Sequence, residues 1–204
     1  MSRGDVGLLV ERAVAEVAEP QVEPGVKARS LAVMRAALTA EEELAAAASR
    51  RVARAAEEAV WLGASLADLG ELTGRSRQAA RKRWPGLGAI HRKRKWLGDH
   101  VEAVRHVGGL VASRADDLAP VAGNGAFLRL ISRLREGLRR CEADFAEGAE
   151  ESVENWRAFD ELVDVTLRAV IETAGTPATP QADFALHCAT GVVGHYDHAV
   201  SGQA

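Results

Sequence analysis

The chain has 204 residues, 47% hydrophobic and 27% charged, and carries a formal net charge of −3. This length allows one large or two small domains, and the near-neutral charge on its own argues weakly against nucleic acid as a partner. The two cysteines, Cys141 and Cys188, are too far apart for a disulfide framework or a paired-cysteine zinc site, and no apolar run approaches the ~20 residues that span a bilayer.

The pattern of residues predicts an all-α protein, because helix formers dominate and alternating strand segments are absent. We expect a first amphipathic helix over residues 5–19 and a second near residues 26–38, separated by a Pro- and Gly-containing break. Thr39, followed by Ala40-Glu41-Glu42, has the pattern of a capping box for a new long helix to about Leu62. We expect Leu44, Ala48, Val52 and Val60 of this helix to face the core, and residues 1–38 to form an N-terminal helical segment.

Residues 65–84 have the parts of a helix-turn-helix. Ser65 can cap a first helix, with Asp68 three residues on in a capping-box-like arrangement. Gly70 is small where two helices must cross closely, and Gly74 stands where the turn needs a residue that tolerates positive φ. The inward face of this first helix is expected to consist of Leu66, Leu69 and Leu72.

A second helix is expected to begin at Ser76 and to end before Pro85, because the residue before a proline is pushed out of helical geometry. Ala79 and Ala80 would face the first helix, and Arg83 would reach from the helix end towards a phosphate. Arginine and glutamine side chains can pair bidentately with guanine and adenine edges in the major groove. One outward arc of about 140° on this helix contains two arginines, a glutamine and a lysine: Arg77, Gln78, Arg81 and Lys82.

Residues 60–85 resemble the helix-turn-helix of small actinobacterial DNA-binding regulators. The residues that match this pattern are Ala64, Ser65, Ala67, Leu69, Gly70, Gly74, Ser76, Arg77, Gln78, Ala79, Ala80, Arg83 and Trp84. One departure is Arg75, which stands where those proteins usually place a small aliphatic residue that seals the turn. The resemblance implies DNA binding, and it does not specify an operator or the direction of regulation.

The distribution of charge supports an anionic partner. Between Leu72 and Gly98 there is no acidic residue, and outside this stretch 17 basic residues stand against 29 acidic ones, a net of −12. A compact positive patch on an otherwise acidic protein is the electrostatic footprint of a phosphate-binding surface. The basic residues of this stretch are Arg75, Arg77, Arg81, Lys82, Arg83, Arg92, Lys93, Arg94 and Lys95.

The run from His91 to Lys95 opens a helix expected over residues 89–113. Cations at a helix N-terminus oppose the macrodipole at a cost of about 0.3–1 kcal/mol each, and an anionic partner would offset that cost. We therefore interpret Arg92, Lys93, Arg94 and Lys95 as phosphate contacts, the alternative being an ordinary solvated helix end. Residues 39–113 together would form the DNA-binding domain.

A boundary is expected at residues 116–125, and residues 126–204 would form a C-terminal assembly domain built as a helical bundle or a coiled-coil-like region. A further helix is expected over residues 152–171, and a terminal helix over residues 181–199. Before them, a heptad pattern spaced 4, 3, 4, 3, 4 defines what we name the seam: Phe127, Ile131, Leu134, Leu138, Cys141 and Phe145.

The seam can pair with a second chain or with the helix at residues 152–171 of the same chain. A homodimer is favoured over a monomer, because one helix-turn-helix covers few base pairs and two-fold pairing doubles the contact.

No catalytic, cofactor or metal site is expected. The tail residues His187, Cys188, His195 and His198 invite a metal hypothesis, but Cys188 and His195 are about 10.5 Å apart along a straight helix. The chain has no phosphate-binding glycine loop, nucleophile elbow or zinc-protease pattern.

The sequence therefore favours a sequence-preferring DNA-binding protein that is not an enzyme, acting as a transcription regulator on double-stranded DNA in the cytoplasm, at the nucleoid. Base edges are assigned to Arg77, Gln78 and Arg81, and phosphates to Ser76, Lys82, Arg83 and the 92–95 cluster. Two alternatives stay open: an architectural, nucleoid-type DNA-binding protein, and a helical protein-interaction module with a basic patch. The first residues lack a signal-peptide pattern, and no membrane association is expected.

Overall fold

The structure is a computed structural model that describes residues 25–121 and 124–201. Every element in these two ranges is a helix, which confirms the expected all-α class. The helix expected over residues 5–19 lies outside the described residues. No helix in the described ranges is both long enough and apolar enough to cross a membrane.

The chain forms two compact units, Met1–Ala55 and Ala56–Ala204. Helix α2 (Val26–Trp61) supplies the described residues of the first unit, and from Ala56 onward it belongs to the second. The new helix start predicted at Thr39 is wrong, because the helix continues through this residue. The Thr39 hydroxyl donates to the Arg35 carbonyl one turn back, at 3.2 Å, and so serves the helix interior.

The inward face of α2 was predicted only in part. Val60 is fully buried, whereas Val52 is 43% exposed. Ala36 and Ala40 are the buried residues of α2 within the described part of the first unit. Small side chains therefore occupy the covered face there, and the alanine-rich sequence around them gave no hydrophobic period to read.

The second unit contains two hydrophobic clusters. The smaller one, named the α3–α4 cluster, joins the end of α2 to α3 (Leu66–Leu72), α4 (Arg77–Arg83) and the first residue of α5 (Leu87–Ser113). The larger one, named the main core, begins near Trp61 and Trp96 and includes the C-terminal helices. Ile90 packs against both clusters, so α5 contributes to each.

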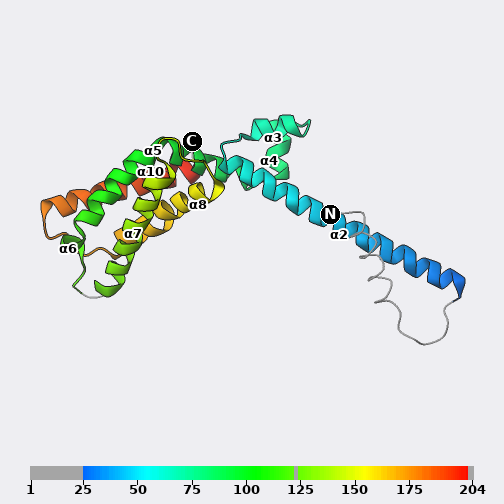
Figure 1. The fold of residues 1–204 in the computed structure, drawn as a ribbon, viewed down its shortest axis with the longest axis horizontal. Helices are drawn as coiled ribbons and strands as arrows, with labels where there is room; N and C mark the ends of the chain where they lie inside the picture. The colour runs from blue at the N-terminus through cyan, green and yellow to red at the C-terminus, as the bar shows by residue number, and fades with distance from the viewer. Residues whose placement is uncertain (1–24, 122–123, 202–204) are drawn as a thin grey trace. The chain divides into compact units, whose positions relative to one another are not determined.

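The main core is built by α5, α6 (Ala115–Leu118), α7 (Asn124–Asp144), α8 (Val153–Glu161), the π-helix η1 (Leu162–Leu167), α9 (Arg168–Thr173) and α10 (Pro180–Ser201). Helix α10 runs along α5, and α5 also contacts α7 and α8 (Figure 1). The core continues across the boundary expected at residues 116–125, since Leu118 and Phe127 are both fully buried in it. The domain limits drawn from the sequence stay a prediction.

Two backbone hydrogen bonds join the segment before α10 to α6. The amide of Gly175 donates to the Leu118 carbonyl at 2.8 Å, and the amide of Ala178 donates to the Asp117 carbonyl at 2.9 Å. A Cβ at Gly175 would lie 2.9 Å from the Pro120 Cα, so only glycine allows this approach. The segment before α10 is therefore bonded to α6 along its backbone.

The seam packs within the chain. Phe127, Ile131, Leu134 and Cys141 are buried in the main core, and Leu138 and Phe145 pack against it. Leu162 packs directly over Gly137 of α7: a Cβ at Gly137 would lie 2.6 Å from Leu162 Cδ1, so this side chain would have to move. Of the two partners left open for the seam, the structure selects helices of the same chain.

Replacement of Leu134 by alanine should lower the free energy of unfolding by about 2–5 kcal/mol, because it leaves a cavity in the main core. Leu134 is 1% exposed, and Leu128 on the same helix is 43% exposed. Leu128→Ala is the matched control and should change stability by no more than about 0.5 kcal/mol. Urea unfolding measures both; equal losses would contradict an internal seam.

Candidate nucleic-acid interface

Helix α3 begins with the capping box that the sequence predicts. The Ser65 hydroxyl accepts from the amides of Ala67 and Asp68, each at 3.2 Å, and the Ser65 amide donates to Asp68 Oδ2 at 2.7 Å. Hydrogen bonding from the Ser65 backbone, followed by that from its side chain, lowers the pKa of the Asp68 carboxyl. The start of α3 is thus fixed by its own side chains.

The turn between α3 and α4 depends on two glycines. A Cβ at Gly70 would lie 2.7 Å from the Arg75 carbonyl oxygen, so the backbone after the turn passes directly over this position. Gly74 has φ +63°, the left-handed conformation expected of it. The amide of Arg75 donates to the Gly70 carbonyl at 2.7 Å, which closes the turn through the backbone.

One expected inward residue of α3 is wrong. Leu66 and Leu69 are buried, but Leu72 is 83% exposed. Each step of three residues falls about 60° short of a full turn. Two such steps therefore rotate Leu72 about 120° away from Leu66 and out of the α3–α4 cluster.

Helix α4 has one seated face and one exposed face. The Ser76 hydroxyl accepts from the Ala79 amide at 3.2 Å and caps the helix, which ends at the Trp84 C-cap before Pro85 as predicted. Ala80 is fully buried, so the helix rests on its smallest side chain. The exposed residues at this helix include every predicted contact of the segment: Ser76, Arg77, Gln78, Arg81, Lys82 and Arg83.

A groove of about 700 Å³, named the α4–α5 groove, lies beside this exposed face. Its walls are formed by Arg77, Gln78 and Arg81 of α4, by Gly88, His91 and Arg92 of α5, and by Leu66 of α3. Among the described residues that line the groove there is no carboxylate. The side chains predicted to read bases therefore share a hollow with the first turns of α5.

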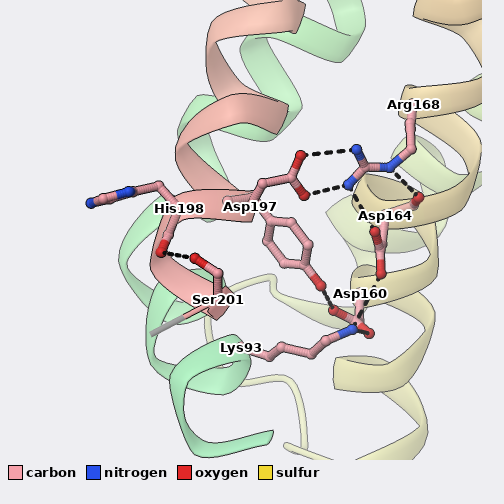
Figure 2. A network of polar contacts seen from close by, with 8 residues as sticks. Lys93, Asp160, Asp164, Arg168, Asp197, His198 and Ser201 are labelled. Atoms are coloured by element: carbon pink, nitrogen blue, oxygen red, sulfur yellow. Dashed lines mark hydrogen bonds and ion pairs between the residues drawn. The ribbon is translucent and has the colours of Figure 1, made fainter. Parts of the chain in front are cut away.

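The four cations of the 92–95 cluster differ in their surroundings. Lys93 Nζ lies 2.9 Å from Asp160 Oδ2 and 3.3 Å from Asp164 Oδ2 (Figure 2). Burial acts to lower the pKa of the Lys93 ammonium, but the hydrogen bonds and charges of the two aspartates outweigh it and the net pKa is raised. The anion expected to offset the helix-end charge is, for Lys93, a pair of carboxylates of the same chain.

Arg94 is also bound within the protein. Its Nε donates to the Trp61 carbonyl at 3.0 Å, and its Nη2 lies 2.5 Å from Glu151 Oε1. The guanidinium carbon sits 3.4 Å from the centre of the Trp156 ring, a cation–π contact. The phosphate role predicted for Lys93 and Arg94 is thereby replaced by an internal one.

The other two cations of the run differ from these. Arg92 Nε donates to the Val200 carbonyl of α10 at 3.0 Å, and the side chain lines the α4–α5 groove. Lys95 is exposed. Arg92 and Lys95 are therefore the members of the cluster that stay accessible to an outside anion.

A polar network continues from Lys93 into α9 and α10 (Figure 2). The Tyr196 hydroxyl donates to Asp160 Oδ1 at 2.5 Å, and burial followed by this bond raises the pKa of Tyr196. Arg168 binds both Asp197 and Asp164, and its pairing with Asp197 raises the pKa of the guanidinium and lowers that of the carboxyl. The sequence contains one signal for this network that the prediction missed. It is the i, i+4 spacing of Asp160, Asp164 and Arg168, which places their side chains on one helix face.

Of the tail histidines, His195 belongs to an aromatic group with Trp96, His100 and Tyr196. Trp96 Nε1 donates to His195 Nδ1 at 3.3 Å, and the His100 ring stacks on Trp96 with centroids 4.3 Å apart. Among the described residues, no group of three or more His, Cys, Asp or Glu side chains is placed to hold a metal ion.

Comparison of the chain with protein-family models, with curated proteins and with solved structures finds no match. The chemistry of the residues is therefore the basis for a function. Within the described ranges, the five cations from Arg75 to Arg83 form no ion pair with a described carboxylate, whereas Lys93 and Arg94 do. The exposed face of α4, together with Arg92 and Lys95 of α5, is thus the part of the basic stretch available to a partner.

Lys93→Gln should lower the free energy of unfolding by about 1.5–3 kcal/mol, because it leaves the partly buried Asp160 carboxylate without a cation and Asp164 with Arg168 alone. Lys95→Gln removes the same charge from an exposed site two residues away and should change stability by no more than about 0.5 kcal/mol. Thermal and urea unfolding of the two variants give the comparison. If Lys93→Gln were as stable as the wild type, the internal role of Lys93 would be wrong.

Proposed function

We propose that the protein binds double-stranded DNA with a preference for sequence and acts as a transcription regulator, with α4 in the major groove. The observation that carries the proposal is the exposed, uncommitted basic face of α4, opposite a buried Ala80. An α-helix fits the major groove, where each base pair presents its own pattern of donors and acceptors. Arg77, Gln78 and Arg81 are assigned to base edges.

The internal contacts of α5 change the expected phosphate contacts. We no longer assign Lys93 and Arg94 to phosphates, because their charges are already paired within the chain. Ser76, Lys82 and Arg83 at α4 stay assigned, together with Arg92 and Lys95. Phosphate contacts fix register and orientation, and base contacts supply the discrimination between sequences.

A homodimer stays part of the proposal, because one α3–α4 segment covers few base pairs and a pair doubles the contact. The seam is not the surface that would form it, since that surface is covered by the chain's own helices. We place the protein in the cytoplasm, at the nucleoid, where its DNA would be.

Selection of bound duplexes from random DNA tests the proposal against its alternatives. Enrichment of a defined motif supports a sequence-preferring regulator. Enrichment of bendable or narrow-groove sequences without a motif would replace it by an architectural protein. Failure to retain any duplex would replace it by a protein-interaction module whose basic patch meets an acidic partner.

Arg77→Ala should weaken binding to the selected duplex by about 1–3 kcal/mol and reduce the discrimination between that duplex and a scrambled one; Gln78→Ala should behave in the same way. Arg129→Ala is the matched control, because it removes one positive charge from an exposed position on α7. It should leave the affinity ratio of the two duplexes unchanged. Equal loss by Arg77→Ala on both duplexes would exclude base readout by this residue.

A further inference from the structure

We propose that the α4–α5 groove is a seat for one phosphate of the DNA backbone, with Arg92 as its fixed cation. This inference rests on the proposed function and adds the place where one strand lies. The 92–95 cluster then has divided roles, because Arg92 serves the nucleic acid while Lys93 and Arg94 serve the fold.

The lining of the groove matches an anion. Arg77 and Arg81 stand one helical turn apart on the α4 wall, and His91 and Arg92 stand on the α5 wall. Gly88 also lines the groove on the α5 side. A Cβ built on Gly88 would lie 3.7 Å from Arg92 Nη1, so the guanidinium lies close to the backbone of α5. The described lining holds three arginines and no carboxylate, so like charges repel one another across the groove until an anion enters.

Arg92 is held in place before any ligand arrives. Its Nε–H is taken by the Val200 carbonyl at 3.0 Å, and the two terminal amino groups of the guanidinium are the donors left for a ligand. A long side chain that is already ordered loses less conformational entropy on binding than a free one. The planar fork that remains suits two oxygens of a phosphate.

Position favours a backbone phosphate over a free anion. Arg77, Gln78 and Arg81 belong both to the groove and to the exposed face assigned to the bases. A duplex that presents base edges to this face brings the adjoining strand to the α5 wall, where Arg92 lies. The Val200 carbonyl then gives α10 a direct influence on affinity, since it sets the position of a DNA-contacting guanidinium.

The test uses the full-length protein and the selected duplex, with single phosphates replaced in turn by neutral methylphosphonate. For the wild type we expect a loss of about tenfold at the phosphate that enters the groove. Arg92→Ala should lose a similar factor on the unmodified duplex, lower the log–log salt slope by about 0.9, and show no further loss at that one methylphosphonate. Arg92→Lys keeps the charge without the planar fork, so its affinity for the unmodified duplex should lie between those of the wild type and Arg92→Ala.

Lys95→Ala is the matched control, because it removes a neighbouring exposed charge that does not line the groove. It should keep the full, position-specific methylphosphonate loss. If the wild type binds DNA and Arg92→Ala shows the same methylphosphonate profile as the wild type, the phosphate seat is overturned and the proposed function stands. If the wild type binds no duplex, the proposed function itself fails.

Two further measurements keep the result clear. Thermal unfolding would reveal whether Arg92→Ala misfolds. In that case the methylphosphonate scan of the wild type, which needs no variant, tests the phosphate seat by itself. A scan without any position-specific loss of affinity overturns the seat. Titration with inorganic phosphate separates the two sources of the anion. Saturable binding that depends on Arg92, with no methylphosphonate effect in DNA, would show a free-anion site and overturn the backbone assignment.

Discussion

The contact of Lys93 with Asp160 and Asp164 determines how the basic stretch of this protein is used. It joins α5 to α8 and to the π-helix η1, and it neutralises an ammonium at the point where α5 passes from the α3–α4 cluster to the main core. Partly buried charges are costly unless they are paired, so the acidic residues here are bound to a structural role. The same pairing removes Lys93 from the surface that a nucleic acid could meet.

Helical geometry explains why neighbouring cations have different partners. Successive residues of a helix point about 100° apart, so four consecutive basic residues are distributed around α5. Arg92 points to the end of α10 and the α4–α5 groove, Lys93 to α8 and η1, and Arg94 to Trp61 and Trp156. The number of positive charges in a run therefore overstates the charge available to a partner, and the helical face of each residue decides its role.

The features predicted well from the sequence are those set by local chemistry. The caps at Ser65 and Ser76, the positive φ of Gly74 and the end of α4 before Pro85 each depend on a few adjacent residues. The features that failed are local patterns compatible with more than one structure, and contacts between distant parts of the chain. Thr39 had a capping pattern, but its hydroxyl bonds within a continuing helix. The π-helix η1 was not predicted, because the apolar residues around it have the spacing of a regular α-helix. The internal partners of Lys93 and Arg94 lie between 33 and 71 residues away along the chain, beyond any motif.

In the proposed function, the acidic remainder of the protein would add to the selectivity of the basic face. Outside residues 73–97 the chain sums to −12, and a net negative charge repels a polyanion at distances within about 10 Å at moderate salt. The exposed cations of α4 form no ion pair with a described carboxylate, whereas Lys93 and Arg94 are paired within the chain. A duplex approaching such a charge distribution would be oriented by the field before contact. Internal neutralisation of part of a basic run would thus contribute to specificity as well as to stability, because it lowers the positive charge outside the exposed face of α4.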